Sequence, residues 1–252
     1  MVSAQVQGRD MAQSEAQLSF QWSEETVIEI QSDDDINRID EMFDPLLDAA
    51  DGNAVRAPIH AIAFVDSVET LKKAVSRFKS FGDEVTTFEF RFTAPVDNSE
   101  EEIQLHQIDG VKSRLILSGE GDSPVRVSML RFELRADAIQ IHNLAWIGGS
   151  LPMSYVRAEV GQYFEMKNVT VADNRYNVDK EPDASPMFDL KPAAQTGEKV
   201  LLRFEHVDFS NNTVHSLVDV SRGGAEVEVQ KKDVTFQENV CFPGSCFSFG
   251  DK

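Results

Sequence analysis

Two aspartates at matching places in the chain are the best candidates for acidic chemistry. Asp189 stands in a Met-Phe-Asp-Leu line, and Asp219 stands in a Leu-Val-Asp-Val line. Each alternates with apolar neighbours, so both side chains should point outward from strands, with Ser248 next in the same column. Paired carboxylates can coordinate Ca²⁺ or act as acid and base on a sugar. We therefore take Asp189 and Asp219 as candidate catalytic residues and Ca²⁺ as the one cofactor to consider.

A second candidate group combines acids with a base. Asp173 and Arg175 flank Asn174, and Asp208 lies further along the chain in a similar line. Together the three charged residues could supply an acid and a base. The alternative is that they are turn residues and surface charges.

The stretch from Arg175 to Ser185 reads as a surface loop. It is polar, contains Pro182, and lengthens one repeat relative to the others. Insertions in repeat proteins map to surface loops that often bind partners. The candidate binding residues are Arg175, Tyr176, Asp179 and Lys180.

The elements that must position these residues come from a recurring line of about nine residues. The four copies are Ile141–Gly149, Met166–Asn174, Phe204–Asn212 and Lys231–Asn239. Apolar and polar residues alternate in each copy, which indicates strands, and recurrence at about 25 to 38 residues indicates a repeat architecture. We predict a mainly β fold in which the strands stack as the coils of a solenoid.

The repeat also predicts which side chains point inward and where the chain bends. Two inward columns follow from the alignment: Leu144, Val169, Val207 and Val234, and then Trp146, Val171, Phe209 and Phe236. The position before the first column needs a left-handed residue, which Asn, Asp and His adopt more readily than others. It holds Asn143, Asn168, His206 and Asp233. The closing residues Gly149, Asn174, Asn212 and Asn239 suit an exit turn, with an internal hydrogen-bond ladder as a further role.

The N-terminal part follows a different pattern. Ile59 to Val65 predicts a buried strand, Asp66-Ser67 predicts a helix cap, and Val85 to Thr93 predicts another strand. Solenoid ends need covering by atypical units. We therefore divide the chain into a flexible tail over 1–17, a mixed α/β cap over 18–100 and the β-helix over 101–252.

Composition narrows the classes of partner. A net charge of −19 argues against nucleic acid, whose phosphates require a positive surface. No apolar run approaches the length of a transmembrane span. The first 17 residues lack the pattern of a secretory signal, so the compartment stays open, and an extracellular or cell-surface place fits if the chain has been trimmed. The histidines show no metal-ligand spacing, and we expect no metal centre.

Two cysteines lie near the C-terminus. The Phe-Pro-Gly-Ser segment between Cys241 and Cys246 could bend enough to close a small disulfide. Two free thiols are the alternative.

The repeats resemble those of a known superfamily. Gly223-Gly224-Ala225, Phe209-Ser-Asn-Asn212 and Phe236-Gln-Glu-Asn239 resemble the Gly-Gly-Ala and Phe-x-x-Asn repeats of polymorphic outer-membrane-type proteins, within the pectin-lyase-like superfamily. The resemblance covers roughly residues 103 to 249. It implies a right-handed parallel β-helix, a fold that hosts lyases, hydrolases, adhesins and structural parts.

Three functions remain as hypotheses. The first is a non-catalytic β-helix that binds a protein assembly or a polysaccharide through its outer face and the 175–185 loop. The second is a polysaccharide lyase or glycoside hydrolase of the pectin-lyase-like superfamily. The third is a structural subunit that self-associates through an open C-terminal coil.

Overall fold

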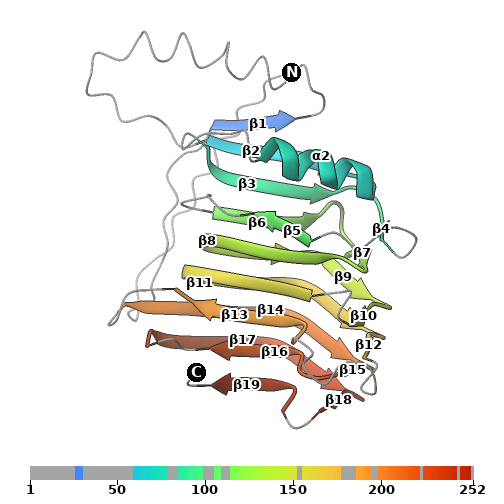
Figure 1. The fold of residues 1–252 in the computed structure, drawn as a ribbon, viewed down its shortest axis with the longest axis vertical. Coiled ribbons are helices and arrows are strands. Elements are labelled where there is room, and N and C mark those ends of the chain that lie inside the picture. The colour runs from blue at the N-terminus through green and yellow to red at the C-terminus, as the bar shows by residue number, and fades with distance from the viewer. Residues whose placement is uncertain are drawn as a thin grey trace.

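The chain forms a parallel β-solenoid. In the computed structural model, the described residues are 26–30, 59–78, 85–98, 105–108, 114–151, 155–176, 186–193, 198–221, 224–242 and 245–250. Within them, about five turns stack along one axis, with the N-terminal strands at one end and the last coil at the other (Figure 1). The prediction of a mainly β, parallel solenoid is confirmed. The right-handed sense and the domain boundaries stay predictions.

Three faces make up each coil, and strand register defines them. Face 1 is the longest stack. It consists of β1 (Thr26–Ile30), β2 (Ile59–Val65), β3 (Val85–Phe92), β6 (Arg114–Gly119) and parts of four long strands. These parts are the end of β8 (Arg131–His142), the middle of β11 (Tyr155–Ala172) and the starts of β14 (Lys199–Ser210) and β17 (Glu226–Gln237).

The other two faces complete the coil. Face 2 consists of β4 (Val96–Asp97), β7 (Val125–Ser128), β9 (Leu144–Ile147) and the ends of β11, β14 and β17. Face 3 consists of β5 (Leu105–Ile108), the starts of β8 and β11, β13 (Phe188–Pro192), β16 (Val218–Ser221) and β19 (Phe247–Gly250). A small separate sheet holds β10 (Ser150–Leu151), β12 (Arg175–Tyr176), β15 (Thr213–Val214) and β18 (Val240–Cys241).

The bend between faces 1 and 2 lies where the sequence predicts it. Asn143, Asn168, His206 and Asp233 all have φ between 52° and 54°. The left-handed conformation costs an ordinary residue about 1 kcal/mol or more, and a short polar side chain reduces that cost. These four residues therefore let each coil turn a corner without glycine.

The exit turn differs in detail from the prediction. The left-handed residues are Gly148, Asp173, Asn211 and Glu238, each one position before the residue that we assigned to the turn. Asn174 and Asn212 instead point their amides inward and are buried. Their side chains form the internal ladder: Asn174 Nδ2 donates to Asn212 Oδ1 at 2.9 Å, and Asn212 Nδ2 donates to Asn239 Oδ1 at 2.8 Å.

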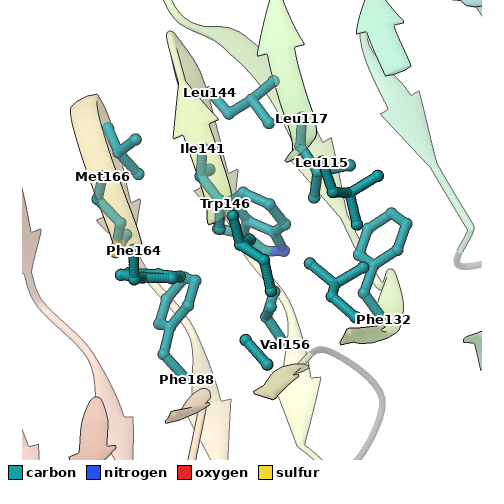
Figure 2. Packing of buried hydrophobic residues seen from close by; sticks show 14 of the residues in the cluster. Leu115, Leu117, Phe132, Ile141, Leu144, Trp146, Val156, Phe164, Met166 and Phe188 are labelled. Carbon is teal, nitrogen blue, oxygen red and sulfur yellow. The ribbon is translucent and has the colours of Figure 1, made fainter. Parts of the chain in front are cut away.

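The interior is a continuous stack of apolar side chains. The first three members of both predicted inward columns are buried, whereas Val234 is half-buried and Phe236 is exposed in the last coil. Trp146 meets Phe188 edge-on at 5.8 Å between ring centroids. Figure 2 shows Trp146 among Phe132, Val156 and Phe188, contributed by strands of faces 2 and 3. Burial of such rings is the main source of stability in a fold of this kind.

The N-terminal strands join the same sheet. Between β2 and β3 the chain crosses over through α2 (Val68–Phe78), which contacts β2, β3 and β5. Ser67 caps this helix, since its Oγ accepts a hydrogen bond from the Thr70 N–H at 3.2 Å. Val68, Leu71, Ala74 and Val75 of α2 enter the main core. Within the described residues, no helix is both long and apolar enough to span a membrane.

Candidate functional site

The predicted acidic pair lies in register on face 3. Asp189 of β13 is directly opposite Asp219 of β16, and Asp219 is opposite Ser248 of β19. Asp189 accepts from Arg157 Nε at 3.2 Å and lies 3.4 Å from Lys191 Nζ. Asp219 accepts a hydrogen bond from the Ser248 hydroxyl. Two cationic side chains thus contact the Asp189 carboxylate, an arrangement typical of a structural ion pair.

Arg157 extends this column into a chain of charges. Its Nη1 is 2.8 Å from Glu133 Oε1, so the guanidinium bridges Glu133 on β8 and Asp189 on β13. The Tyr155 ring lies beside it, with the Arg157 Cζ 5.6 Å from the ring centroid and the Arg131 Cζ 5.0 Å from it. The outward side of face 3 is therefore a ladder of matched charges around one tyrosine.

The second predicted group does not assemble as one site. Arg175 donates from Nη1 to the Asn211 carbonyl at 2.7 Å and from Nη2 to Asn211 Oδ1 at 3.2 Å. Asp173 accepts from Asn211 Nδ2 at 2.5 Å. Asp208 instead accepts hydroxyl hydrogen bonds from Ser210 and Thr235. Among the described residues, no ion pair or hydrogen bond links Asp208 to Asp173 or Arg175, so the geometry gives turn and corner contacts.

The predicted binding loop is described at its start. Arg175 is exposed and anchored to the next coil through Asn211 and Thr213, and Tyr176 pairs through its backbone with Leu151. Asp179 and Lys180 lie outside the described residues. Arg175 thus ties the described start of this segment to the next coil.

A cluster around Glu165, whose pKa is strongly lowered, was not singled out from the sequence. Glu165 of β11 points outward on face 1 yet is buried. Its Oε2 lies 2.9 Å from His142 Nε2 and accepts from Gln140 Nε2 at 3.1 Å, and Arg203 Nη1 lies 3.7 Å from its Oε1. Burial acts to raise the pKa of Glu165, but hydrogen bonds from His142 and Tyr163 and the charge of Arg203 outweigh it and hold the pKa at about 2.

A neighbouring carboxylate collects still more cations. Glu205 of β14 is 2.7 Å from Arg203 Nη2, 3.1 Å from Lys232 Nζ and 3.9 Å from Lys167 Nζ. His206 Nε2 lies 3.6 Å from its Oε1. The hydrogen bond from Lys232, with the charges of Lys167 and Arg203, lowers the pKa of Glu205. Lys167, Glu205 and Lys232 thus pair across neighbouring strands, whereas His142, in the same outward column, pairs with Glu165.

A third outward carboxylate repeats the pattern near the N-terminal end. Glu89 of β3 lies 2.9 Å from His60 Nε2 and 2.8 Å from Arg91 Nε, and it accepts from the Ser118 hydroxyl at 2.5 Å. Burial acts to raise the pKa of Glu89, but these partners outweigh burial and lower the pKa to about 2. Glu89 and Glu165 stand in one outward column of face 1, separated by Ile116 and Gln140.

These glutamates were missed because their partners are distant in sequence. Glu165 and His142 are 23 residues apart, and Glu89 and Ser118 are 29 apart. The available signal was a lone Glu between two large apolar residues in a strand, as in Phe88-Glu-Phe90 and Phe164-Glu-Met166. Such alternation says only that Glu faces outward. Within the part of the chain that the structure describes, no three His, Cys, Asp or Glu side chains gather to hold a metal ion.

The last coil carries a covalent link. Cys241 of β18 and Cys246, just before β19, form a disulfide with their Cα atoms 5.3 Å apart. This decides between the two alternatives that the sequence left open. The bond closes the turn from the small sheet to face 3 in the coil whose edge is exposed.

Comparison with known proteins adds no relative. No family model, curated protein or solved structure matches this chain. The parallel solenoid therefore rests on strand register, and the finer resemblance to pectin-lyase-like proteins is part of the proposal below.

Proposed function

We propose that this protein is a non-catalytic β-solenoid that binds a protein assembly or a polysaccharide through its outer face and the 175–185 loop. The observation that carries the proposal is that the outward carboxylates are held by partners. Asp189 has two cations within 3.4 Å, and Glu165 and Glu205 each contact several cationic or polar groups. Carboxylates fixed in this way build a rigid display surface.

The electrostatics of these groups weigh against acid catalysis. A general acid on a glycosidic oxygen needs a pKa raised toward the working pH. The pKa of Glu165 is instead held at about 2, and that of Glu205 is lowered. Both groups are ionised at neutral pH and already accept hydrogen bonds. The proposal includes membership of the pectin-lyase-like superfamily, because the Phe-x-x-Asn lines end on the ladder asparagines Asn212 and Asn239.

The experiment combines binding and cleavage on one panel. The full chain is incubated with neutral and acidic polysaccharides, with co-sedimentation for binding and release of reducing or unsaturated ends for cleavage. We expect binding without cleavage, with and without Ca²⁺. Cleavage that disappears in the Asp189→Ala/Asp219→Ala double variant would establish the lyase or hydrolase alternative and overturn the proposal.

A second candidate function, a stacking structural subunit, is favoured by the C-terminal coil. Phe236, Val240 and Phe242 are large apolar side chains left 42%, 46% and 46% exposed there. Among the described strands, β17 pairs with β14 on one edge and with none on the other. Figure 1 shows β17 and β19 at the end of the stack. Long open edges with apolar side chains favour association.

Size measurement in solution tests this candidate. Light scattering on the full chain should give an assembly that dissociates in the Phe236→Ser/Val240→Ser variant. The matched control is Val27→Ser, a valine at the opposite end of the stack, which should leave the assembly unchanged. A monomer at all concentrations up to about 100 μM would rule the stacking function out.

A further inference from the structure

One carboxylate on face 1 is surrounded by more cations than it can neutralise. Glu205 has a side chain that is 8% exposed, and it lies between Lys167, Arg203 and Lys232, whose side chains are 51%, 43% and 63% exposed. The three cations come from three successive strands, β11, β14 and β17. Glu205 is therefore buried beneath the three cations, and the cations form the solvent-accessible surface of the cluster.

The local charge balance is positive on a strongly acidic chain. The cluster holds three permanent cations against the two carboxylates Glu205 and Glu165, which leaves one positive charge. His142 and His206 add to it when protonated. The chain as a whole carries −19. A positive site in such a chain attracts anions locally although the overall field does not.

The margins of the cluster are also charged. Asp233 Oδ2 lies 3.3 Å from His206 Nδ1 at the corner, and Glu228 pairs with Lys199 on the opposite side. Glu228 already has a cationic neighbour in Lys199, and Asp233 has one when His206 is protonated. The cations around Glu205 thus keep unused hydrogen-bond donors, since each ammonium has three N–H groups and the guanidinium has five.

We propose that Lys167, Arg203 and Lys232 bind a tetrahedral oxyanion ester, a sulfate or phosphate group carried on a glycan. Such an ester has three free oxygens, which matches donors that converge from three strands, whereas a carboxylate has two. Lys167 and Lys232 are in register with Glu205 on either side of it, and Arg203 lies two residues earlier on β14. Strands stand about 4.8 Å apart, so the two lysines are about 10 Å apart at their backbones and can hold one group between them above Glu205, with Arg203 beside it.

The surroundings favour a sugar chain over a protein as the carrier. Protein interfaces need exposed aromatic or aliphatic anchors at their centre. The apolar residues beside this cluster, Ala138, Tyr163 and Leu201, are already buried. The exposed groups are polar and charged, which suits a hydroxyl-rich ligand. This inference rests on the proposed binding function and names the ligand class for one part of the outer face.

The test uses the full chain and four probes: dextran sulfate, phosphorylated dextran, polygalacturonate and neutral dextran. Binding to at least one of the two esters is expected, weakening as salt rises, with polygalacturonate at least tenfold weaker and neutral dextran inert. Lys167→Gln and Lys232→Gln should each weaken ester binding about tenfold, and Lys167→Arg should retain it. The control Lys73→Gln removes an exposed lysine of α2, paired with Glu69, and should leave binding unchanged.

The outcomes separate this inference from the proposed function. The inference is overturned if Lys167→Gln and Lys232→Gln bind the esters as tightly as the wild type does. It is also overturned if the wild type binds polygalacturonate as tightly as it binds the esters. A neutral glycan or a protein that binds all variants equally would also refute it, while leaving the binding function intact. Cleavage of the polysaccharide panel would instead refute the proposed function. Thermal unfolding of each variant confirms that the fold is retained.

Discussion

The side chains of Asn174 and Asn212 meet at 2.9 Å in the interior of the solenoid, where one amide donates to the other. Each amide also donates to a backbone carbonyl of the preceding coil. Asn174 Nδ2 donates to the Trp146 and Ala172 carbonyls, and Asn212 Nδ2 donates to the Val171 carbonyl. A turn that faces an apolar core leaves backbone groups without partners, and this ladder supplies them.

Loss of a central rung should be costly. In Asn212→Ala, the buried Asn174 N–H loses its side-chain acceptor and the Val171 carbonyl loses the hydrogen bond from Asn212 Nδ2. An unsatisfied buried group costs about 1–3 kcal/mol, so we expect the free energy of unfolding to fall by about 2–4 kcal/mol. Urea unfolding measures it. The control is Asn211→Ala, the exposed neighbour; an equal loss there would argue against the ladder as the cause.

Two stacked phenylalanines should respond differently to truncation. Phe209 and Phe236 lie 4.9 Å apart with nearly parallel rings, but Phe209 is fully buried and Phe236 is 42% exposed. Phe209→Ala should lower the free energy of unfolding by about 3–5 kcal/mol, and Phe236→Ala by about 1 kcal/mol. Equal losses in thermal or urea unfolding would mean that the last coil is covered in solution, as the stacking function requires.

Acid should weaken the fold through Glu89 and Glu165. Their pKa values are held at about 2, below the ordinary value of 4.5. A depressed folded-state pKa gives stability that is full above the unfolded pKa and disappears as pH falls through the folded pKa. Stability should therefore fall between about pH 5 and pH 2, by on the order of 2 kcal/mol for each group after allowance for solvent screening.

The corresponding variants identify the groups responsible. Glu89→Gln and Glu165→Gln should be less stable than the wild type at pH 7 and should lose less on acidification. Urea midpoints from pH 2 to pH 7 supply the comparison. Glu159→Gln is the control, since Glu159 is exposed and paired with Arg135 at 3.3 Å. Parallel pH curves for all four proteins would show that other carboxylates govern the acid response.

Reduction of the disulfide should affect the last coil alone. Cys241 and Cys246 are five residues apart, and a loop of that size stabilises by about 2 kcal/mol in the chain-entropy account. Hydrogen exchange should speed up in β18 and β19 after reduction, or in Cys241→Ser/Cys246→Ser, with protection of β8 and β11 unchanged. Global unfolding on reduction would contradict this local role.

Several features were predictable because they depend on neighbours in sequence. Alternation over Ile59 to Val65 predicted β2, and the inward columns of Trp146 and Phe209 followed from aligning the copies. The left-handed residues at Asn143 and His206 were predictable because backbone sterics select their types. The exit turn was displaced by one residue, since both Asp173 and Asn174 are types that suit turns and only the core distinguishes them.

The amino-acid sequence by itself determined the repeat, its inward columns and the register of Asp189 with Asp219, because strand periodicity and recurrence are local properties. The tertiary structure decided which outward-facing carboxylates are buried and which cationic side chains pair with them. Stacking brings Glu165 to His142 and Arg203, and Glu205 to Lys167 and Lys232, across coils of different length. Ion pairs and burial depend on distances through space, and these distances cannot be read from the order of residues along the chain.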